Sequence, residues 1–332
     1  MRTADHPGTV PDSALLAAFG PDSLGIIVVS DLAPRFAALR TRLLSYASHI
    51  AAQPPAALAA LEAPAAHYLV GWSCGKEALA AGRPDTLKGS YYVNCAFYKS
   101  HELDGADGAD RYPDLPEYTA GNVWPAALPG FEAACKELCA LVIDTAALVA
   151  RACDRYAAAQ VPDYVPGYLE RVVKSSTTTK ARLLHYFPPG AEEEDDDAAL
   201  DSWCGTHLDH GCLTGLTSAM YVDEIATPPV NAADSVDLPE LAGPPDTDAG
   251  LYIKDRAGEI VKVGIPRDAL AFQTGEALER ITRGRFRAVP HFVRGMASAK
   301  GRGVALNTWI SRGKSWVPPR WDRALAMLNT AS

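Results

Sequence analysis

The second half of the chain alternates short apolar runs with turn residues, and this pattern restricts the possible folds more than any other feature. The runs that we interpret as strands are residues 181–187, 212–222, 250–254, 259–263, 269–273, 277–281, 286–293 and 302–311. Turn-forming pairs such as Thr274-Gly275 and Arg283-Gly284 separate several of them. Many short strands with turn signals between them are typical of a sandwich or a jelly roll. We therefore predict a mainly β fold with flanking helices.

The first half of the chain shows a different periodicity. Apolar residues recur at helical spacing within residues 33–52 and again from residue 131 to about residue 158, which predicts two amphipathic helices. Residues 24–32 are rich in β-branched side chains and predict a buried strand. Residues 1–23 indicate an irregular lead-in, and the glycines of residues 71–97 indicate an ordered loop. We expect one domain over residues 1–332, in which a mostly helical region, residues 1–175, packs on a core formed by residues 176–315.

Composition narrows the class of protein. The chain has 332 residues, of which 48% are hydrophobic, and this is ample for a large core. A formal net charge of −9 argues against a nucleic-acid or anionic membrane partner, since either would require a basic surface. No apolar run approaches the roughly 20 residues of a membrane span, and the N-terminus lacks an apolar signal region. We therefore expect a cytoplasmic location.

The cysteine content supports this expectation, and an acidic run predicts a further surface feature. The seven cysteines include no C-x-x-C pair, which predicts free thiols in a reducing compartment. Residues 192–197 read E-E-E-D-D-D, and six like charges in a row predict a solvated loop.

The stretch from Trp203 to Tyr221 carries the first candidate for chemistry. It places His207 and Asp209 two residues apart, immediately before an apolar run that is typical of a strand. Side chains at this spacing in a strand point to the same side, so an imidazole and a carboxylate can reach one metal ion together. Two imidazoles and one carboxylate leave three metal positions open, which is the arrangement of non-haem Fe(II) oxygenases. His291 is a candidate third ligand, although a set containing His210 also satisfies the spacing.

Several segments, in the same order, resemble the isopenicillin N synthase-like branch of the Fe(II)/2-oxoglutarate-dependent oxygenases. H-L-D-H-G-C-L-T-G-L, which starts at His207, resembles that branch's H-T-D-x-G-x-x-T-x-L. Residues 250–263 resemble its G-L-Q-V hairpin, and residues 269–293 resemble its A-L-V-V-N-x-G-D to S-x-x-H-R-V segment. The resemblance covers most of residues 120–312. It implies a double-stranded β-helix (jelly roll) core and identifies His207, Asp209 and His291 as metal ligands and catalytic centre.

The resemblance also implies the cofactors: Fe(II), 2-oxoglutarate as co-substrate, and O₂. In this family an arginine on a late strand holds the far carboxylate of the keto acid, because a guanidinium fork matches a carboxylate. Arg302, eleven residues after His291, is our candidate, and Arg294 and Arg312 are the alternatives. The family's R-x-N-Y-Y-P strand places further polar groups near the keto acid. Its counterpart here, R-L-L-H-Y-F-P, makes His185 and Tyr186 candidate co-substrate residues.

Two positions depart from the family pattern. Val304 stands where the R-x-S motif has a serine, and Phe187 stands where the earlier strand has its final tyrosine. The loss of both hydroxyls leaves room for a smaller keto acid, a different co-substrate or none. We also expect several side chains of the first half of the chain to lie in loops on the substrate side. They are Trp72, Tyr91, Tyr92, Asn94 and Trp124.

These patterns together predict a mononuclear non-haem Fe(II) oxygenase that uses 2-oxoglutarate. The reaction would be hydroxylation, desaturation or ring closure of a small organic molecule, with no nucleic-acid or membrane partner. Two alternatives stay open: a jelly roll that binds a metal or ligand without turnover, and an Fe(II) oxidase that does not use 2-oxoglutarate. The sequence determines neither the substrate nor the oligomeric state.

Overall fold

The structure is a computed structural model that describes residues 10–77, 85–108, 112–188, 203–229, 236–296 and 303–312, without the side chain of residue 312. Its helices are α1 (Asp12–Phe19), α2 (Arg35–Ala51), α3 (Pro55–Ala60), α4 (Pro116–Thr119), α5 (Phe131–Gln160), α6 (Tyr168–Ser175) and α7 (Glu276–Ile281). Its strands are β1 (Ile26–Val29), β2 (Gly71–Cys74), β3 (Lys88–Asn94), β4 (Lys180–Tyr186), β5 (Cys204–His207), β6 (Leu213–Thr217), β7 (Met220–Asp223), β8 (Gly250–Lys254), β9 (Ile260–Val263), β10 (Leu270–Thr274), β11 (His291–Arg294) and β12 (Val304–Arg312).

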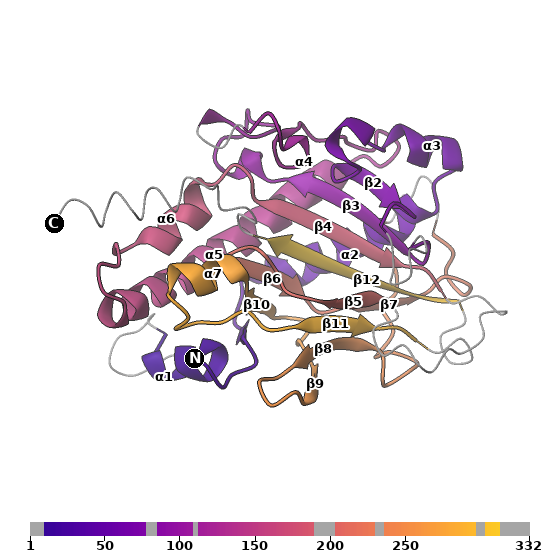
Figure 1. The fold of residues 1–332 in the computed structure, drawn as a ribbon. Coiled ribbons are helices and arrows are strands. Elements are labelled where there is room, and N and C mark those ends of the chain that lie inside the picture. The colour runs from indigo at the N-terminus through magenta and orange to yellow at the C-terminus, as the bar shows by residue number, and fades with distance from the viewer. Residues whose placement is uncertain are drawn as a thin grey trace.

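The strands form two antiparallel sheets, seen in Figure 1. The larger sheet has the order β1-β10-β6-β12-β4-β3-β2, and β7 also pairs with β12. The smaller sheet has the order β5-β11-β8-β9. Apart from the consecutive pairs β2–β3 and β8–β9, neighbouring strands in each sheet come from distant parts of the sequence, as in a jelly roll. The prediction of a mainly β jelly-roll core with flanking helices is confirmed.

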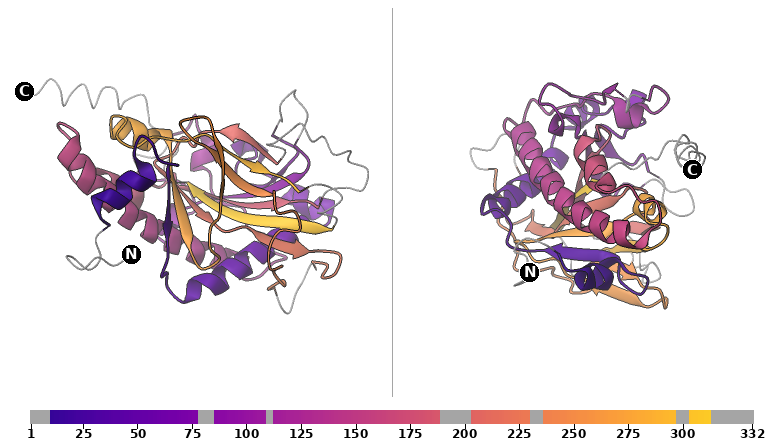
Figure 2. Two further views of the ribbon diagram at one scale, coloured as in Figure 1. Left: turned by 90° about the horizontal axis from the view of Figure 1, so that it is seen from below. Right: turned by 90° about the vertical axis from the view of Figure 1, so that its left-hand side faces the viewer.

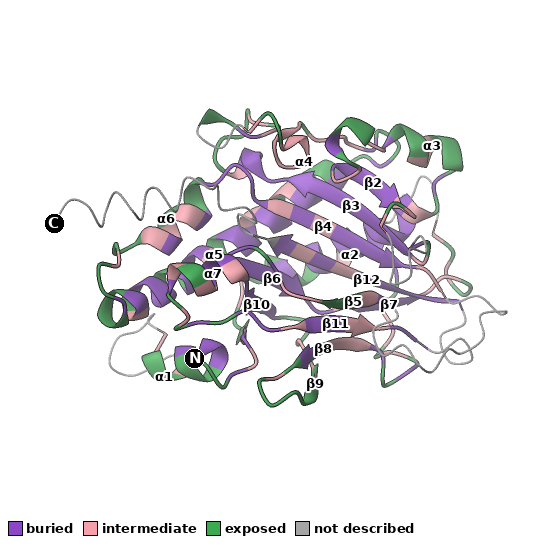
Figure 3. Cartoon of the chain, in the orientation of Figure 1, coloured by how far each residue is buried: buried purple, intermediate pink, exposed green. Residues whose placement is uncertain are grey.

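Two long helices cover one face of the larger sheet. Helix α2 contacts β4 and β12, and α5 contacts β6, β10 and β12, while the two helices also contact each other. Their apolar residues join the main core with Trp309 of β12 and Phe272 of β10. Figures 1 and 2 show α5 crossing the sheet, and Figure 3 shows that the central strands are buried whereas α3 and the turn beside β9 are exposed. The smaller sheet lies on the other side, so the space between the sheets is available for a site.

The N-terminal region contributes more strands than its sequence predicts. Residues 71–97, predicted to be a loop, contain the hairpin of β2 and β3, which extends the larger sheet beyond β4. All seven residues of β3 are buried. The glycines of this segment, Gly89 among them, led to the prediction of a loop. In the structure Gly89 instead makes room for the indole of Trp72, because a Cβ added there would lie 2.2 Å from that ring. Strand β1, predicted within residues 24–32 as a buried strand, pairs with β10, but its residues are half-buried or exposed because it stands at the end of the larger sheet's strand order.

Three other predictions about local structure need correction. Residues 277–281 form helix α7, because Glu276 and Glu279 suit its first turn and a run this short has no distinctive period. The predicted strand 212–222 divides into β6 and β7, and residues 12–19 of the predicted irregular lead-in form α1. The acidic run 192–197 lies outside the described residues.

Other sequence-based expectations can be compared directly with the structure. All seven cysteines are free thiols, as predicted. Within the described residues, no helix combines the length and the apolar character that crossing a membrane requires.

Candidate metal centre

His207, Asp209 and His291 lie together where the two sheets face each other. Their candidate ligand atoms all lie within 4.8 Å of one another. Asp209 Oδ1 is 3.8 Å from His207 Nε2, and its Oδ2 is 3.9 Å from His291 Nε2. The two histidines are brought together because β5 and β11 are neighbours with His207 paired to His291. Asp209 follows two residues after the end of β5 and is buried.

Hydrogen bonds on the far side of each imidazole orient its Nε2 atom toward Asp209. His207 Nδ1 lies 2.8 Å from the carbonyl of Gly205, and His291 Nδ1 lies 3.2 Å from the carbonyl of Val289. Since a carbonyl only accepts, the contact of His207 places its proton on Nδ1 and leaves the Nε2 lone pair for a metal. Gln273 Nε2 also lies 2.8 Å from His291 Nδ1, so two groups hold this ring with its Nε2 facing Asp209. Such outer contacts are typical of metal-binding histidines.

The loop that carries Asp209 is held against the turn between β10 and α7. The amide of Glu276 donates to the carbonyl of Asp209 at 2.8 Å, and the amide of Ala277 donates to the carbonyl of Gly211 at 3.2 Å. Gly275 makes this approach possible, because a Cβ there would lie 2.2 Å from the Gly211 carbonyl oxygen. The family-like G-E pair after β10 therefore has a direct role in positioning the carboxylate.

The arrangement fits a divalent metal ion with open positions. Two ligands that are each roughly 2.1 Å from one ion lie at most about 4.2 Å apart. Both distances from Asp209 to the histidines meet this limit. Two imidazole nitrogens and one carboxylate form the facial set that suits non-haem Fe(II). His210 does not join this cluster: it is exposed and pairs with Glu276.

The cluster lines a cavity of about 310 Å³ between the sheets. This volume is within the range of small-molecule sites. The walls are formed by inward-facing residues of β4, β6, β8, β11 and β12 and by residues 242–244, 262–265 and 267. Strand register gives the cavity two ends, which we name the metal end and the distal end.

The metal end includes Arg182 of β4. Gln273, the hydrogen-bond partner of His291, is paired with Thr214 on β6. Two residues further along β6, Leu216 is paired with Ile310 of β12. Ile310 is in turn paired with Arg182. Burial opposes ionisation of the Cys204 thiol, whereas His207 and Arg182 both lower its pKa, and Cys204 Sγ lies 3.9 Å from His207 Nδ1, so the arginine shares a neighbour with this candidate ligand.

The distal end contains two tyrosines. Leu306 of β12 is paired with Tyr186 on one side and with Tyr221 of β7 on the other, and all three line the cavity. Tyr186 stacks on Trp203 with ring centroids 4.9 Å apart. Burial raises the pKa of Tyr186 and raises that of Tyr221 to about 12, so both hydroxyls stay protonated and can donate hydrogen bonds.

The two predicted co-substrate residues on β4 face opposite directions. Tyr186 lines the cavity, whereas His185 lies on the other face of the strand, where its Nδ1 is 2.8 Å from Asn307 Oδ1. Phe187, predicted to occupy the position of the family's final tyrosine, packs edge-on against the His185 ring. Side chains alternate along a strand, so the neighbouring residues 185 and 186 cannot both face the cavity.

Of the three candidate arginine anchors, only Arg294 lies wholly within the described residues. Arg302 and the side chain of Arg312 lie outside them. Arg294 follows Val293, which lines the cavity, so its side chain points to the opposite face of β11. Val304 is buried in a second apolar cluster with Tyr186 and Tyr221.

The aromatic residues predicted on the substrate side are not in loops around the cavity. Trp72, Tyr91 and Tyr92 belong to β2 and β3, and Trp124 packs on Phe131 at the start of α5. A further residue of this set, Asn94, is the last residue of β3 and donates a hydrogen bond to the carbonyl of Ala120. In the described part of the chain, none of these five side chains lines the cavity, because they pack in or beside the main core.

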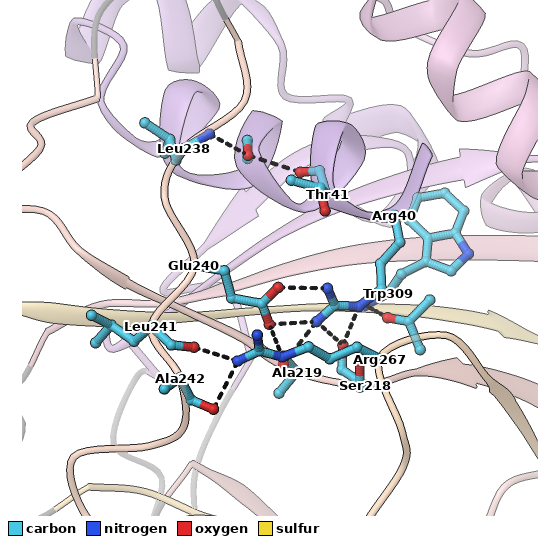
Figure 4. A network of polar contacts seen from close by, with 12 residues as sticks. Arg40, Thr41, Ser218, Ala219, Leu238, Glu240, Leu241, Ala242, Arg267 and Trp309 are labelled. Carbon is cyan, nitrogen blue, oxygen red and sulfur yellow. Dashed lines mark hydrogen bonds and ion pairs between the residues drawn. The ribbon is translucent and has the colours of Figure 1, made fainter. Parts of the chain in front are cut away.

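One wall of the cavity is fixed by a buried ion pair that the sequence did not indicate. Figure 4 shows Arg40 of α2 reaching Glu240, with both Nη atoms 2.9 Å from the carboxylate oxygens. Arg40 also donates to the carbonyls of Ser218 and Ala219, which line the cavity. Arg267 pairs with Glu240 at 3.1 Å from the cavity side. The network ties residues 240–244 to the turn between β6 and β7.

Solved structures of similar fold include oxygenases. A 2OG-Fe(II) oxygenase family protein from Caulobacter crescentus is 18% identical, with a TM-score of 0.60 over 90% of this chain and 79% of that one. The chain has the fold of the Fe(II)/2-oxoglutarate-dependent oxygenases. A full-length Neurospora crassa protein in complex with alpha-KG and thymine is 16% identical, with a TM-score of 0.59 over 91% and 80% of the two chains.

A third similar structure is JOX2 in complex with 2OG, Fe and JA, which is 12% identical with a TM-score of 0.57 over 92% of this chain and 72% of that one. No family model matches the sequence, and no curated protein matches it. At these identities the similarity establishes the fold alone.

Proposed function

We propose that this protein is a mononuclear non-haem Fe(II) oxygenase of the isopenicillin N synthase-like branch. It uses 2-oxoglutarate and O₂ to oxidise a small organic molecule. The observation that carries the proposal is the His207, Asp209 and His291 cluster at one end of a cavity, within the oxygenase fold. A closed structural metal site would use four protein ligands, whereas three leave positions for reactants.

The three ligands have the chemistry that the metal requires. His207 and His291 present neutral nitrogens, and Asp209 supplies one negative charge in a buried position. When bound there, Fe(II) would supply the redox chemistry that couples O₂ and the keto acid to oxidation of a C–H bond. The protein's part is to hold the ligands in one geometry and to keep bulk water from the site.

The distal end suits the far carboxylate of 2-oxoglutarate. The hydroxyls of Tyr186 and Tyr221 are protonated donors there, and hydrogen bonds from such donors to a carboxylate are charge-assisted. Arg302, by its position in the family motif, is proposed as the cationic partner. Val304 is paired with Asp223, and Tyr221 precedes Asp223 by two residues on β7, so Tyr221 provides a hydroxyl close to Val304. We infer that Tyr221 compensates for the serine that Val304 replaces.

The substrate is proposed to be a small molecule that enters at the metal end. Among the similar structures, the Neurospora crassa protein is in complex with thymine and JOX2 is in complex with JA, so this fold accommodates different small molecules. The reaction on this protein's substrate is proposed to be hydroxylation, desaturation or ring closure. Each of these starts from a C–H bond placed next to the metal.

The deciding experiment is an anaerobic titration of the Fe(II)-loaded protein with 2-oxoglutarate, followed by the visible iron-to-keto-acid charge-transfer band. We expect a saturable band in the wild type.

We expect no tight Fe(II) binding in His207→Ala or His291→Ala. Arg302→Ala should keep the metal and bind the keto acid more weakly. Iron binding without a band would contradict the co-substrate and favour an oxidase or a ligand-binding protein without turnover, and full metal binding in both histidine variants would exclude the ligand set.

A further inference from the structure

A cluster of charged side chains adjoins the metal end of the cavity, and the metal site does not use it. Arg182 Nη2 lies 2.6 Å from Glu77 Oε1, and Lys88 Nζ lies 3.0 Å from Glu77 Oε2. Lys88 also lies 2.6 Å from Asp85, and both of these side chains are buried. Of the four, Arg182 alone lines the cavity among the residues that the structure describes.

The guanidinium of Arg182 is held in one orientation. Its Nε and Nη2 both donate to Ser90 Oγ, at 3.1 and 2.7 Å, and Nη2 also donates to Glu77. The Tyr92 ring lies 4.8 Å from the guanidinium carbon, and the Tyr92 hydroxyl donates to the same Glu77 carboxylate. Nη1 makes no hydrogen bond to any residue in the described part of the chain. A fixed fork with one nitrogen left for the cavity is a preformed donor site.

The cluster is electrically balanced before any ligand arrives. Arg182 and Lys88 carry two positive charges, and Glu77 and Asp85 carry two negative charges. Burial opposes ionisation of Glu77, but the neighbouring cations lower its pKa to about 2, so it stays charged. A carboxylate ligand would add a negative charge to this balanced cluster, which is costly in a buried site. A neutral oxygen acceptor adds no charge.

We propose that Arg182 Nη1 binds a neutral carbonyl oxygen of the primary substrate, so that the substrate is a small ketone, lactam or related carbonyl compound. This inference rests on the proposed function, because it assigns the distal end to the keto acid and the metal end to the substrate. The donor then fixes the carbonyl compound against the wall formed by β4 and orients its neighbouring C–H bonds toward the metal ligands.

The test uses the Fe(II)- and 2-oxoglutarate-loaded protein under anaerobic conditions and three small probes of similar shape. The probes are cyclohexanone, cyclohexanecarboxylate and methylcyclohexane. Dissociation constants are measured by ligand-observed NMR and by perturbation of the charge-transfer band. We expect cyclohexanone to bind at least tenfold more tightly than either of the other probes. Methylcyclohexane lacks the hydrogen bond to the charged donor, and cyclohexanecarboxylate brings a negative charge into the buried site.

Arg182→Met alone leaves Glu77 with fewer partners, so the double variant Arg182→Met/Glu77→Gln keeps the cluster balanced. In this variant we expect the preference for cyclohexanone over methylcyclohexane to fall below twofold, while the keto-acid band is retained. A preference for the carboxylate, an unchanged preference in the double variant, or no binding of any probe to band-positive protein would each overturn the proposal. Absence of the band itself would instead contradict the proposed function.

Discussion

Gln273 contacts one candidate metal ligand, His291, without itself belonging to the candidate ligand set. Its Nε2 lies 2.8 Å from His291 Nδ1, and the carbonyl of Val289 lies 3.2 Å from the same ring nitrogen. Together these contacts hold the ring with its Nε2 facing Asp209. Nothing in the sequence pattern distinguishes this glutamine from an ordinary buried strand residue.

We predict that Gln273→Leu lowers Fe(II) affinity by roughly tenfold to hundredfold, as the loss of an outer partner of a histidine ligand commonly does. Anaerobic calorimetric titration with Fe(II) measures the change. Gln53→Leu is the matched control, since Gln53 is also buried and hydrogen-bonded but belongs to the segment after α2. Equal affinities in the two variants would show that Gln273 does not position His291.

Tyr221 is the residue that most directly tests the co-substrate site. Tyr221→Phe removes one hydroxyl at the distal end, and we expect the dissociation constant for 2-oxoglutarate to rise about tenfold to hundredfold, because a hydrogen bond to a carboxylate is lost. The charge-transfer titration gives this value. Tyr252→Phe is the control: its hydroxyl donates to the Asp248 carbonyl, and its ring stacks on Phe292. Similar losses in both variants would contradict our placement of the keto acid.

At the scale of secondary-structure elements, helix α2 does more than cover the larger sheet. Arg40 extends from it to Glu240 and to the carbonyls of Ser218 and Ala219, as Figure 4 shows. Arg40 and Glu240 are 2% and 12% exposed, so their pairing occurs largely out of water. The helix thereby fixes the position of a loop that forms a wall of the cavity.

We predict that Arg40→Met lowers the free energy of unfolding by about 3 kcal/mol, the lower end for a broken buried ion pair, because Arg267 still faces Glu240. Arg42→Met on the same helix should cost less than about 1 kcal/mol, since its pair with Asp237 is exposed. Urea unfolding of both variants gives the comparison. A loss of similar size for the two arginines would mean that burial of the Arg40 pair has no energetic consequence.

At the scale of the whole molecule, the candidate metal site joins parts of the chain that fold into different strands. His207 and Asp209 belong to β5 and the loop after it, and His291 belongs to β11. Since unfolding separates these ligands, a metal that binds the cluster stabilises the folded protein.

We therefore predict that the apparent Tm of the metal-free protein rises with added Fe(II), or with Mn(II) as a redox-stable substitute. At a free metal concentration of 100 times Kd the gain is about 2.7 kcal/mol. Differential scanning fluorimetry under anaerobic conditions measures it. Asp209→Ala should abolish the shift, and a shift that persists in that variant would show that the stabilising ion binds elsewhere.

The sequence alone determined the class of fold and the candidate ligands. The series of short apolar runs predicted a mainly β fold, and the order of the motifs identified His207, Asp209 and His291 before any geometry was known. Residue type and spacing along the chain are local properties, so they are readable without the fold.

The tertiary structure decided which face each side chain uses and which distant residues meet. Pairing of β4 with β12 placed Tyr186 in the cavity and turned His185 away from it. The hairpin of β2 and β3 was not recognised because its partner, β4, lies far along the chain. Arg182 meets Glu77 across the same sheet. The physical reason is that a shift of one residue in strand register reverses every side chain, and register is set by contacts between segments remote in sequence.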